Sequence, residues 1–183
     1  MFDVEEFVAD CRAVLERDRS SAAVYEVVAR AVSEPSALIK ALGEPARGQI
    51  QRIYHSPQLT VLNVIWAPKM TIFPHNHDMW AVIGIYSGRE DNVFWRRLPE
   101  DSHRVEAAGA KSLCDKDAVP LGRDIIHSVT NPIGRLTGAL HVYGATSLTP
   151  TAANGTRNRS WNGPAIRSAS SRYSKKRIAG LIS

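Results

Sequence analysis

The hydrophobic pattern of the chain changes its period near residue 50 and does not change back, which restricts the possible folds. From Gln51 onward the 183-residue sequence consists of short apolar segments separated by Pro, Gly, Asn and Ser, as in strands joined by turns. The predicted strands span roughly residues 49–54, 59–66, 70–76, 79–87, 91–98, 103–108, 112–114, 124–130 and 137–143. So many short strands need a closed arrangement that protects their edges, which predicts a β-sandwich or barrel.

The segment before the strands has helical periodicity. Apolar residues at i, i+3, i+4 and i+7 predict amphipathic helices over residues 2–17, 20–33 and 35–42. The pattern therefore predicts an N-terminal helical segment packed on a β-barrel, followed by a tail. The boundaries of these three parts are 1–46, 47–144 and 145–183.

The net charge of +5 is concentrated in the tail. Residues 145–183 contain seven lysines and arginines and no acid, which leaves −2 for residues 1–144. A basic stretch that is poor in apolar residues and has no sustained period is predicted to be a flexible arm. Because the body of the protein is mildly acidic, we do not expect nucleic acid as its partner.

Cysteine usage and hydropathy predict a cytoplasmic protein. Cys11 and Cys114 share no spacing pattern, so neither a disulfide framework nor a cysteine-based zinc site is indicated. No segment approaches the ~18 apolar residues of a membrane span, and the acidic start MFDVEEFVADC differs from a signal peptide. We expect no membrane partner, and monomer and homodimer both stay open.

Two histidines, His75 and His77, lie two residues apart in the segment APKMTIFPHNHDMWAVIGIYSG. The flanks are rich in β-branched and aromatic residues, and at the strand period of 2 both imidazoles leave one face of the same strand. Two converging neutral imidazoles supply half of a metal site, with lone pairs that suit Zn, Fe, Ni or Cu. The alternative is a pair of solvated loop histidines behind Pro74.

The last two predicted strands carry two further histidines. Between DIIHSVTN and LTGALHVYG lies the turn sequence Pro-Ile-Gly-Arg, and an antiparallel hairpin centred on Gly134 would place His127 directly opposite His141. Four of the six histidines would then share a barrel interior. The other two, His55 and His103, are predicted to be surface or loop residues.

Three motifs, PHNHDMWAVIGIYSG, PLGRDIIHSVTN and LHVYG, occur in this order. Together they resemble the cupins, and among these the thiol dioxygenases such as cysteine dioxygenase and 3-mercaptopropionate dioxygenase. The resemblance covers about residues 20–144 and implies a mainly β fold, the cupin double-stranded β-helix or jelly-roll barrel, with two or three N-terminal helices. In most cupins the first motif also contains a metal-binding Glu, and counting back from Gly88 its position is Ala81 here.

The resemblance implies an Fe(II) centre held by three neutral histidines, namely His75, His77 and His127. A dication without a protein anion can accept a substrate thiolate and O₂ together, and the family's product is a sulfinic acid. His141 and Tyr143 match the family's catalytic His and Tyr, which hydrogen bond near O₂ and substrate. The family's usual Ser, two residues before this His, is Ala139 here.

The resemblance also implies that an arginine binds the substrate's carboxylate, because a guanidinium can pair with it through two hydrogen bonds. In cysteine dioxygenases this arginine lies on the strand before the first motif, near the position of Arg52. Arg89 is a second candidate, and a solvated surface charge is the alternative for both. Trp80, three residues after His77, is a candidate for shaping the mouth of the site.

The sequence therefore predicts a non-heme iron(II) thiol dioxygenase that oxidises a small carboxylated thiol, 3-mercaptopropionate or cysteine, with O₂. A second interpretation is a cupin isomerase or hydrolase that uses Zn, Mn or Ni on the same histidines. A third is a cupin that binds a metal or small molecule without catalysis, which Ala139 favours. Nucleic-acid binding through residues 157–177 is the interpretation that the sequence favours least.

Overall fold

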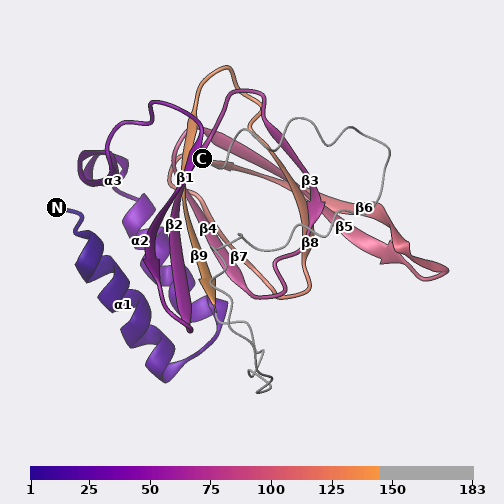
Figure 1. The fold of residues 1–183 in the computed structure, drawn as a ribbon, viewed down its shortest axis with the longest axis horizontal. Helices are drawn as coiled ribbons and strands as arrows, with labels where there is room; N and C mark the ends of the chain where they lie inside the picture. The colour runs from indigo at the N-terminus through magenta and orange to yellow at the C-terminus, as the bar shows by residue number, and fades with distance from the viewer. Residues whose placement is uncertain (145–183) are drawn as a thin grey trace, which may run out of the picture.

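The computed structural model describes residues 1–144, in which helices are followed by strands that form two sheets (Figure 1). The helices are α1 (Val4–Arg17), α2 (Ser21–Val32) and α3 (Pro35–Leu42). The strands are β1 (Gln49–His55), β2 (Leu59–Trp66), β3 (Thr71–His75), β4 (Ala81–Ser87), β5 (Arg89–Leu98), β6 (Asp101–Cys114), β7 (Ala118–Leu121), β8 (Ile126–Thr130) and β9 (Thr137–Gly144). The change from helices to strands lies where the sequence predicts it.

The strands form a jelly roll. The larger sheet has the order β1-β2-β9-β4-β7 and the smaller sheet the order β3-β8-β5-β6, and every pair of neighbouring strands is antiparallel. After β2 the chain passes repeatedly from one sheet to the other, which is the connectivity of a jelly roll. The predicted mainly β fold with N-terminal helices is confirmed.

The helices cover the outer face of the larger sheet (Figure 1). Helix α2 packs on β4, β7 and β9 and buries Val28 and Val32 completely. The approach is close at Gly84 on β4, where a β-carbon would lie 2.6 Å from a methyl carbon of Val28 and 2.8 Å from one of Val32. The absence of a side chain at Gly84 therefore allows α2 to lie directly on the sheet.

The inner face of the larger sheet lines the barrel. All residues of β9 are buried, and successive side chains of a strand point to opposite faces. Leu140 and Val142 point outward into the helix-side core, whereas Ala139, His141 and Tyr143 point into the barrel. The polar side chains of β9 thus lie inside the barrel, where the candidate site is found.

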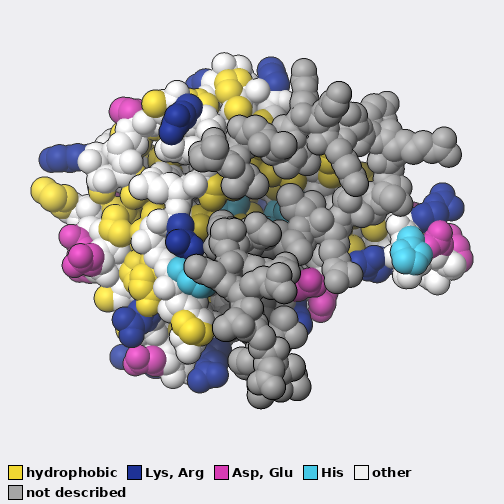
Figure 2. Space-filling view, in the orientation of Figure 1, with side chains coloured by type: hydrophobic (Ala, Val, Ile, Leu, Met, Phe, Trp, Pro, Cys, Tyr) yellow, Lys and Arg dark blue, Asp and Glu magenta, His cyan; other side chains and the backbone are white. Residues whose placement is uncertain are grey.

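The β5–β6 hairpin extends away from the barrel (Figure 1). The predicted strands 103–108 and 112–114 are one strand, because Gly109 pairs with Phe94 within the ladder instead of ending it. Side chains of both charges and histidine gather at the hairpin tip (Figure 2). His103 on this hairpin and His55 on β1 are both exposed, as predicted.

The predicted hairpin between β8 and β9 is wrong. β8 pairs with β3 and β5, whereas β9 pairs with β2 and β4, so the two strands belong to different sheets. The connection is held at the end of β2, because the side-chain amide of Asn131 donates to the carbonyl oxygens of Trp66, Ala67 and Arg135. These hydrogen bonds direct the chain across the barrel instead of back along β8.

Other sequence predictions concern the cysteines, the membrane and the tail. Cys11 is buried, Cys114 is exposed, and both are free. Within residues 1–144 no helix has the length and apolar character needed to cross a membrane. The predicted tail, 145–183, lies outside the described residues.

Candidate metal centre

Three imidazoles meet inside the barrel. His75 is the last residue of β3, and its pairing partner on β8 is His127. His77 follows in the loop that leads to β4. One potential ligand atom from each histidine lies within 4.8 Å of the other two, and the Nε2 atoms of His77 and His127 are 3.0 Å apart. The three histidines could therefore bind a metal ion.

His77 reaches the site through a turn, not along a strand. The strand ends at His75, so the prediction that both histidines leave one strand face is wrong. Asp78 has a φ of 55°, in the left-handed region, and its carboxylate accepts a hydrogen bond of 2.7 Å from the side-chain amide of Asn76. In this turn the ring centroids of His75 and His77 lie 4.9 Å apart.

Two of the rings are oriented by hydrogen bonds. Nδ1 of His75 lies 2.8 Å from the carbonyl oxygen of Phe73, and Nδ1 of His127 lies 2.7 Å from Oδ1 of Asn92. A carbonyl or amide oxygen only accepts, so both Nδ1 atoms carry the proton and both Nε2 atoms keep a lone pair. Contacts of this kind orient histidines that bind metals.

Burial keeps the three imidazoles neutral. Desolvation lowers the pKa of His75 below its ordinary value and lowers the pKa of His77 to about 3. Desolvation, with the neighbouring histidines adding to it, lowers the pKa of His127 to about 2. Since a metal ion binds the neutral imidazole, the rings do not have to lose a proton first at neutral pH.

The spacing of two of the nitrogens fits a metal ion. Two nitrogens bound at right angles to one ion, each about 2.1 Å from it, are about 3.0 Å apart, and Nε2 of His77 and Nε2 of His127 have this separation. His77 also has a buried Nδ1 without a hydrogen-bond partner. A cation between the rings would accept a lone pair from each of these two Nε2 atoms.

The donor set contains no acid among residues 1–144. Ala81, where the motif resemblance places the usual cupin glutamate, is the first residue of β4. Its side chain is fully buried inside the barrel, and it pairs with Tyr143 on β9. A methyl group cannot bind a metal, so Ala81 adds no negatively charged ligand. The three candidate ligands among the described residues are neutral histidines.

A hydrogen-bonded pair lies beside the three histidines. Nδ1 of His141 and the hydroxyl of Tyr143 are 2.9 Å apart, and the rings of Tyr143 and His77 are 5.0 Å apart between centroids. Burial lowers the pKa of His141 to about 3 and raises that of Tyr143. Both side chains are therefore neutral at pH 7. Ala139, fully buried on the same face, offers no hydroxyl to extend the pair.

A buried acid that the sequence analysis missed lies behind the site. Glu90 on β5 has 0% exposure, and its carboxylate accepts hydrogen bonds from Nε1 of Trp66 at 2.6 Å and Nδ2 of Asn92 at 2.9 Å. Its Oε2 is 3.9 Å from Nε2 of His141, a buried nitrogen without a hydrogen-bond partner. Burial raises the pKa of Glu90 to about 7.

The position of Glu90 in the segment REDNVFW indicates that it faces inward, because every second residue of a strand points to the same side. Phe94 pairs with His127 and shares its face, so at a period of 2 Glu90 and Asn92 face the barrel interior as well. The signal is weak in the sequence, because a charged residue on a strand is usually exposed.

Arg52 lies at the edge of the larger sheet. It is exposed on β1 and pairs with Leu62, which pairs in turn with His141. Paired residues point to the same side of a sheet, so Arg52 and His141 share the inner face, two strands or about 10 Å apart. Arg52 therefore lies at the sheet edge, on the same face as His141.

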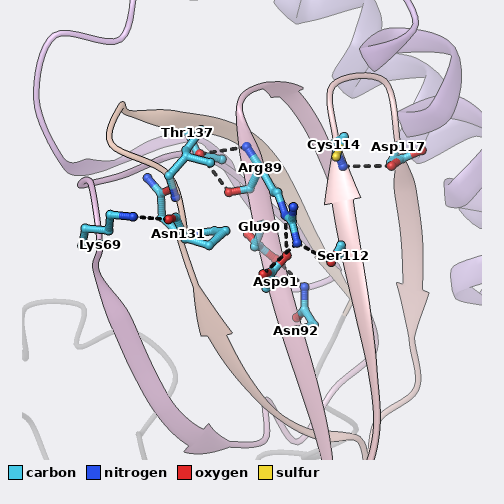
Figure 3. Close-up of polar contacts among 12 residues, drawn as sticks. Lys69, Arg89, Glu90, Asp91, Asn92, Ser112, Cys114, Asp117, Asn131 and Thr137 are labelled. Carbon is cyan, nitrogen blue, oxygen red and sulfur yellow. Dashed lines mark hydrogen bonds and ion pairs between the residues drawn. The ribbon is translucent and has the colours of Figure 1, made fainter.

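The structure does not bring Arg89 and Trp80 to the histidines. Arg89 alternates with Glu90 and points outward, where it forms an ion pair of 2.8 Å with Asp91 (Figure 3). The Trp80 indole packs closely over Gly144 and belongs to the helix-side core. Both side chains lie on faces other than the one that carries the site.

Solved bacterial structures are similar in fold. BH2720 from Bacillus halodurans is 16% identical over 69% of this chain and 83% of that chain, with a TM-score of 0.45. A cupin superfamily protein from Desulfitobacterium hafniense is 10% identical over 56% and 82%, with a TM-score of 0.44. A cupin 2 conserved barrel domain protein from Salinispora arenicola is 19% identical over 54% and 76%, with a TM-score of 0.42.

The chain has a cupin fold. This follows from its two antiparallel sheets, the crossings between them and the N-terminal helices. No family model and no curated protein matches the sequence. At these identities and TM-scores the similarity to solved structures says nothing of function, which has to be argued from the site itself.

Proposed function

We propose that this cupin is a non-heme iron(II) thiol dioxygenase that oxidises a small carboxylated thiol to its sulfinic acid. The proposal is supported above all by the neutral donor set, in which three histidines converge without an acid from the described residues. An acidic ligand would reduce the charge of the centre. Three imidazoles leave the full charge of the ion available to favour a deprotonated thiol.

His75, His77 and His127 would hold the iron, and their spacing and neutral state fit this role. Bound there, Fe(II) supplies the redox chemistry that joins both atoms of O₂ to the thiol sulfur, so that RSH and O₂ give RSO₂H. The protein orients the histidines through Phe73 and Asn92. The buried apolar interior around them limits the access of water.

The hydroxyl of Tyr143 is the group of this chain that can hydrogen bond to the reactants. Its ring lies against His77, and its hydroxyl is held by His141 at 2.9 Å. Burial raises the pKa of Tyr143, so the phenol keeps its proton and remains a donor. We assign Tyr143 the role of orienting the reactants and His141 the role of holding Tyr143.

Arg52 is our candidate for binding the carboxylate of the substrate. It lies on the inner face of the edge strand β1, in one cross-strand row with Leu62 and His141. An arginine there could pair with the carboxylate of a thiol whose sulfur reaches the histidines. Cysteine and 3-mercaptopropionate carry both end groups.

Oxygen consumption with a panel of thiols tests the proposal. Protein loaded with Fe(II) should consume one O₂ per thiol with 3-mercaptopropionate or cysteine and release the sulfinic acid, which mass spectrometry identifies. Cysteamine is the matched control, since it lacks only the carboxylate of cysteine. Arg52→Gln should raise the KM for the carboxylated thiol about tenfold or more and leave cysteamine unaffected. No O₂ uptake with any small thiol would contradict the proposal.

A second candidate function uses a different metal on the same three histidines. Imidazole also suits Zn, Mn and Ni, and the buried Ala139 in place of the thiol dioxygenase serine favours another chemistry or simple binding. Activity assays of protein loaded with redox-inactive Zn distinguish the two functions. Turnover of a substrate with Zn in place of Fe would exclude oxygen chemistry and support an isomerase or hydrolase.

A further inference from the structure

Four buried side chains form a continuous series of hydrogen bonds that ends at His127. Nε1 of Trp66 donates to Oε2 of Glu90 at 2.6 Å, and Nδ2 of Asn92 donates to Oε1 of Glu90 at 2.9 Å. Oδ1 of Asn92 then lies 2.7 Å from Nδ1 of His127. The four residues are exposed by only 7%, 0%, 1% and 1%. Groups this deeply buried cannot exchange partners with water, so each hydrogen bond depends on its neighbours.

When Glu90 is ionised, above its pKa of about 7, the direction of this series is fixed by groups that can only donate or only accept. The indole N–H of Trp66 is a donor without acceptor capacity. The carboxylate of Glu90 accepts from the indole with one oxygen and from Asn92 with the other (Figure 3 shows Glu90 beside Asn92). Asn92 therefore turns its oxygen toward His127, where an oxygen can only accept.

We propose that Glu90, acting through Asn92, holds His127 in the tautomer that can bind a metal. With its proton on Nδ1, His127 keeps a lone pair on Nε2, the atom that faces His77. Glu90 is not one of the three potential metal ligands. It acts on the site through Asn92 and is therefore a positioning residue. The inference rests on the metal site of the proposed function but does not depend on thiol chemistry.

A glutamine at position 90 should reverse the donor and acceptor roles of the hydrogen bonds between residues 90, 92 and 127. In Glu90→Gln, the introduced side-chain oxygen has to accept from Trp66, so the introduced NH₂ group faces Asn92. Asn92 then has to turn its oxygen toward that group and its own NH₂ toward His127. Nδ1 of His127 becomes an acceptor, its proton moves to Nε2, and Nε2 loses the lone pair that a metal needs.

A second substitution should restore the original direction. In the double variant Glu90→Gln with Asn92→Asp, the introduced NH₂ at position 90 donates to one oxygen of the introduced carboxylate. The other oxygen of that carboxylate accepts from Nδ1 of His127. The double variant has the charge of the wild type and nearly the same shape, but the acid and the amide have exchanged places.

Zinc and cobalt binding to the metal-free protein test this proposal. Competition with a chelator should show that Glu90→Gln weakens Zn(II) and Co(II) binding about 10- to 100-fold. The double variant should bind within about threefold of the wild type, while circular dichroism confirms that each variant is folded. Wild-type affinity in Glu90→Gln, or a folded double variant no better than Glu90→Gln, would overturn the proposal.

Nitrogen-15 NMR of the histidine side chains tests the same proposal without a variant. In the metal-free wild type, His127 should carry its proton on Nδ1, and a proton on Nε2 would overturn the proposal. If the thiol dioxygenase proposal alone is wrong, the result is different. The wild type would still bind Zn(II) and Glu90→Gln would still bind it more weakly, but the Fe(II)-loaded protein would consume no O₂.

Discussion

The two faces of the larger sheet are both buried, but they differ in what they bury. On the outer face of β9, Leu140 and Val142 are fully buried in an apolar core beneath the helices. On the inner face of the same strand, His141 and Tyr143 bury polar atoms. An apolar side chain gains about 1.5–3 kcal/mol from burial, whereas a buried polar group costs free energy unless it finds a partner.

The difference teaches how each face constrains its residues. The outer core requires volume and apolarity, and several side chains meet that requirement equally well. The inner face requires a donor or an acceptor at each atom, as the series from Trp66 to His127 shows. The outer face should therefore determine stability and the inner face metal binding and chemistry. Substitutions on each face can test this separation.

The largest effect is expected from His77→Ala. Removing one of the three imidazoles should weaken metal binding by more than about 100-fold and abolish turnover, while the protein stays folded because His77 lies in the loop between β3 and β4 and its loss leaves the apolar clusters intact. Metal analysis after dialysis and calorimetric titration measure the effect. His103→Ala is the matched control, since His103 is exposed on the β5–β6 hairpin and should leave both quantities unchanged. Full metal occupancy in His77→Ala would refute the assignment of the site.

Leu140→Ala is expected to have a large effect on stability and almost none on metal binding. The substitution leaves a cavity between β9 and the helices and should lower the free energy of unfolding by about 2–5 kcal/mol. Metal affinity should stay within about twofold of the wild type, because Leu140 points away from the site. Urea denaturation and metal titration measure the two quantities. A loss of metal affinity as large as the loss of stability would show that the two faces are coupled.

Periodicity predicted the fold well because it reports which faces are buried. The three helices and most strand boundaries follow from it, and the motif resemblance singled out His75, His77 and His127, which the structure brings together. Strand pairing did not follow from local signals. The turn sequence around Gly134 is compatible with a hairpin, but β8 and β9 pair with strands of different sheets, and Asn131 holds the connection to the end of β2.

The inner face was harder to predict for a similar reason. Glu90 and Arg89 are adjacent charged residues, and composition gives no reason to bury one and expose the other. The choice depends on Trp66 and Asn92, which supply two donors on the inward side, and on Asp91, which pairs with Arg89 outside. Such partners become visible only when strands from different parts of the chain are placed side by side.

A moderate effect is expected from Tyr143→Phe. The variant keeps the ring that packs against His77 but loses the hydroxyl that is bonded to His141. One hydrogen bond of about 1.4 kcal/mol corresponds to about a tenfold lower kcat, with metal affinity unchanged. Steady-state O₂ uptake under saturating thiol measures kcat. An unchanged kcat would remove Tyr143 from the chemistry, and an equal loss of metal affinity would give it a structural role instead.

The smallest effect concerns the pH dependence of stability in the metal-free protein. Burial lowers the pKa values of the site histidines. Below about pH 6.5 the unfolded chain therefore takes up protons that the folded chain does not, so the histidines' contribution to stability is present above about pH 6.5 and is lost as the pH falls. Glu90 acts in the opposite direction. Its pKa is raised from 4.5 to about 7, so its contribution is present below about pH 4.5 and is lost as the pH rises through about 7.

Between pH 4.5 and 6.5 Glu90 should therefore offset part of the histidine effect. Stability of the wild type should fall as the pH decreases, and Glu90→Gln should fall more steeply, by about 1 kcal/mol per pH unit, since the variant cannot take up that proton. Urea denaturation across this range measures the two slopes. Glu100→Gln removes an exposed carboxylate and should reproduce the wild-type slope. Equal slopes for the wild type and Glu90→Gln would mean that the inner face does not hold this acid in its protonated form.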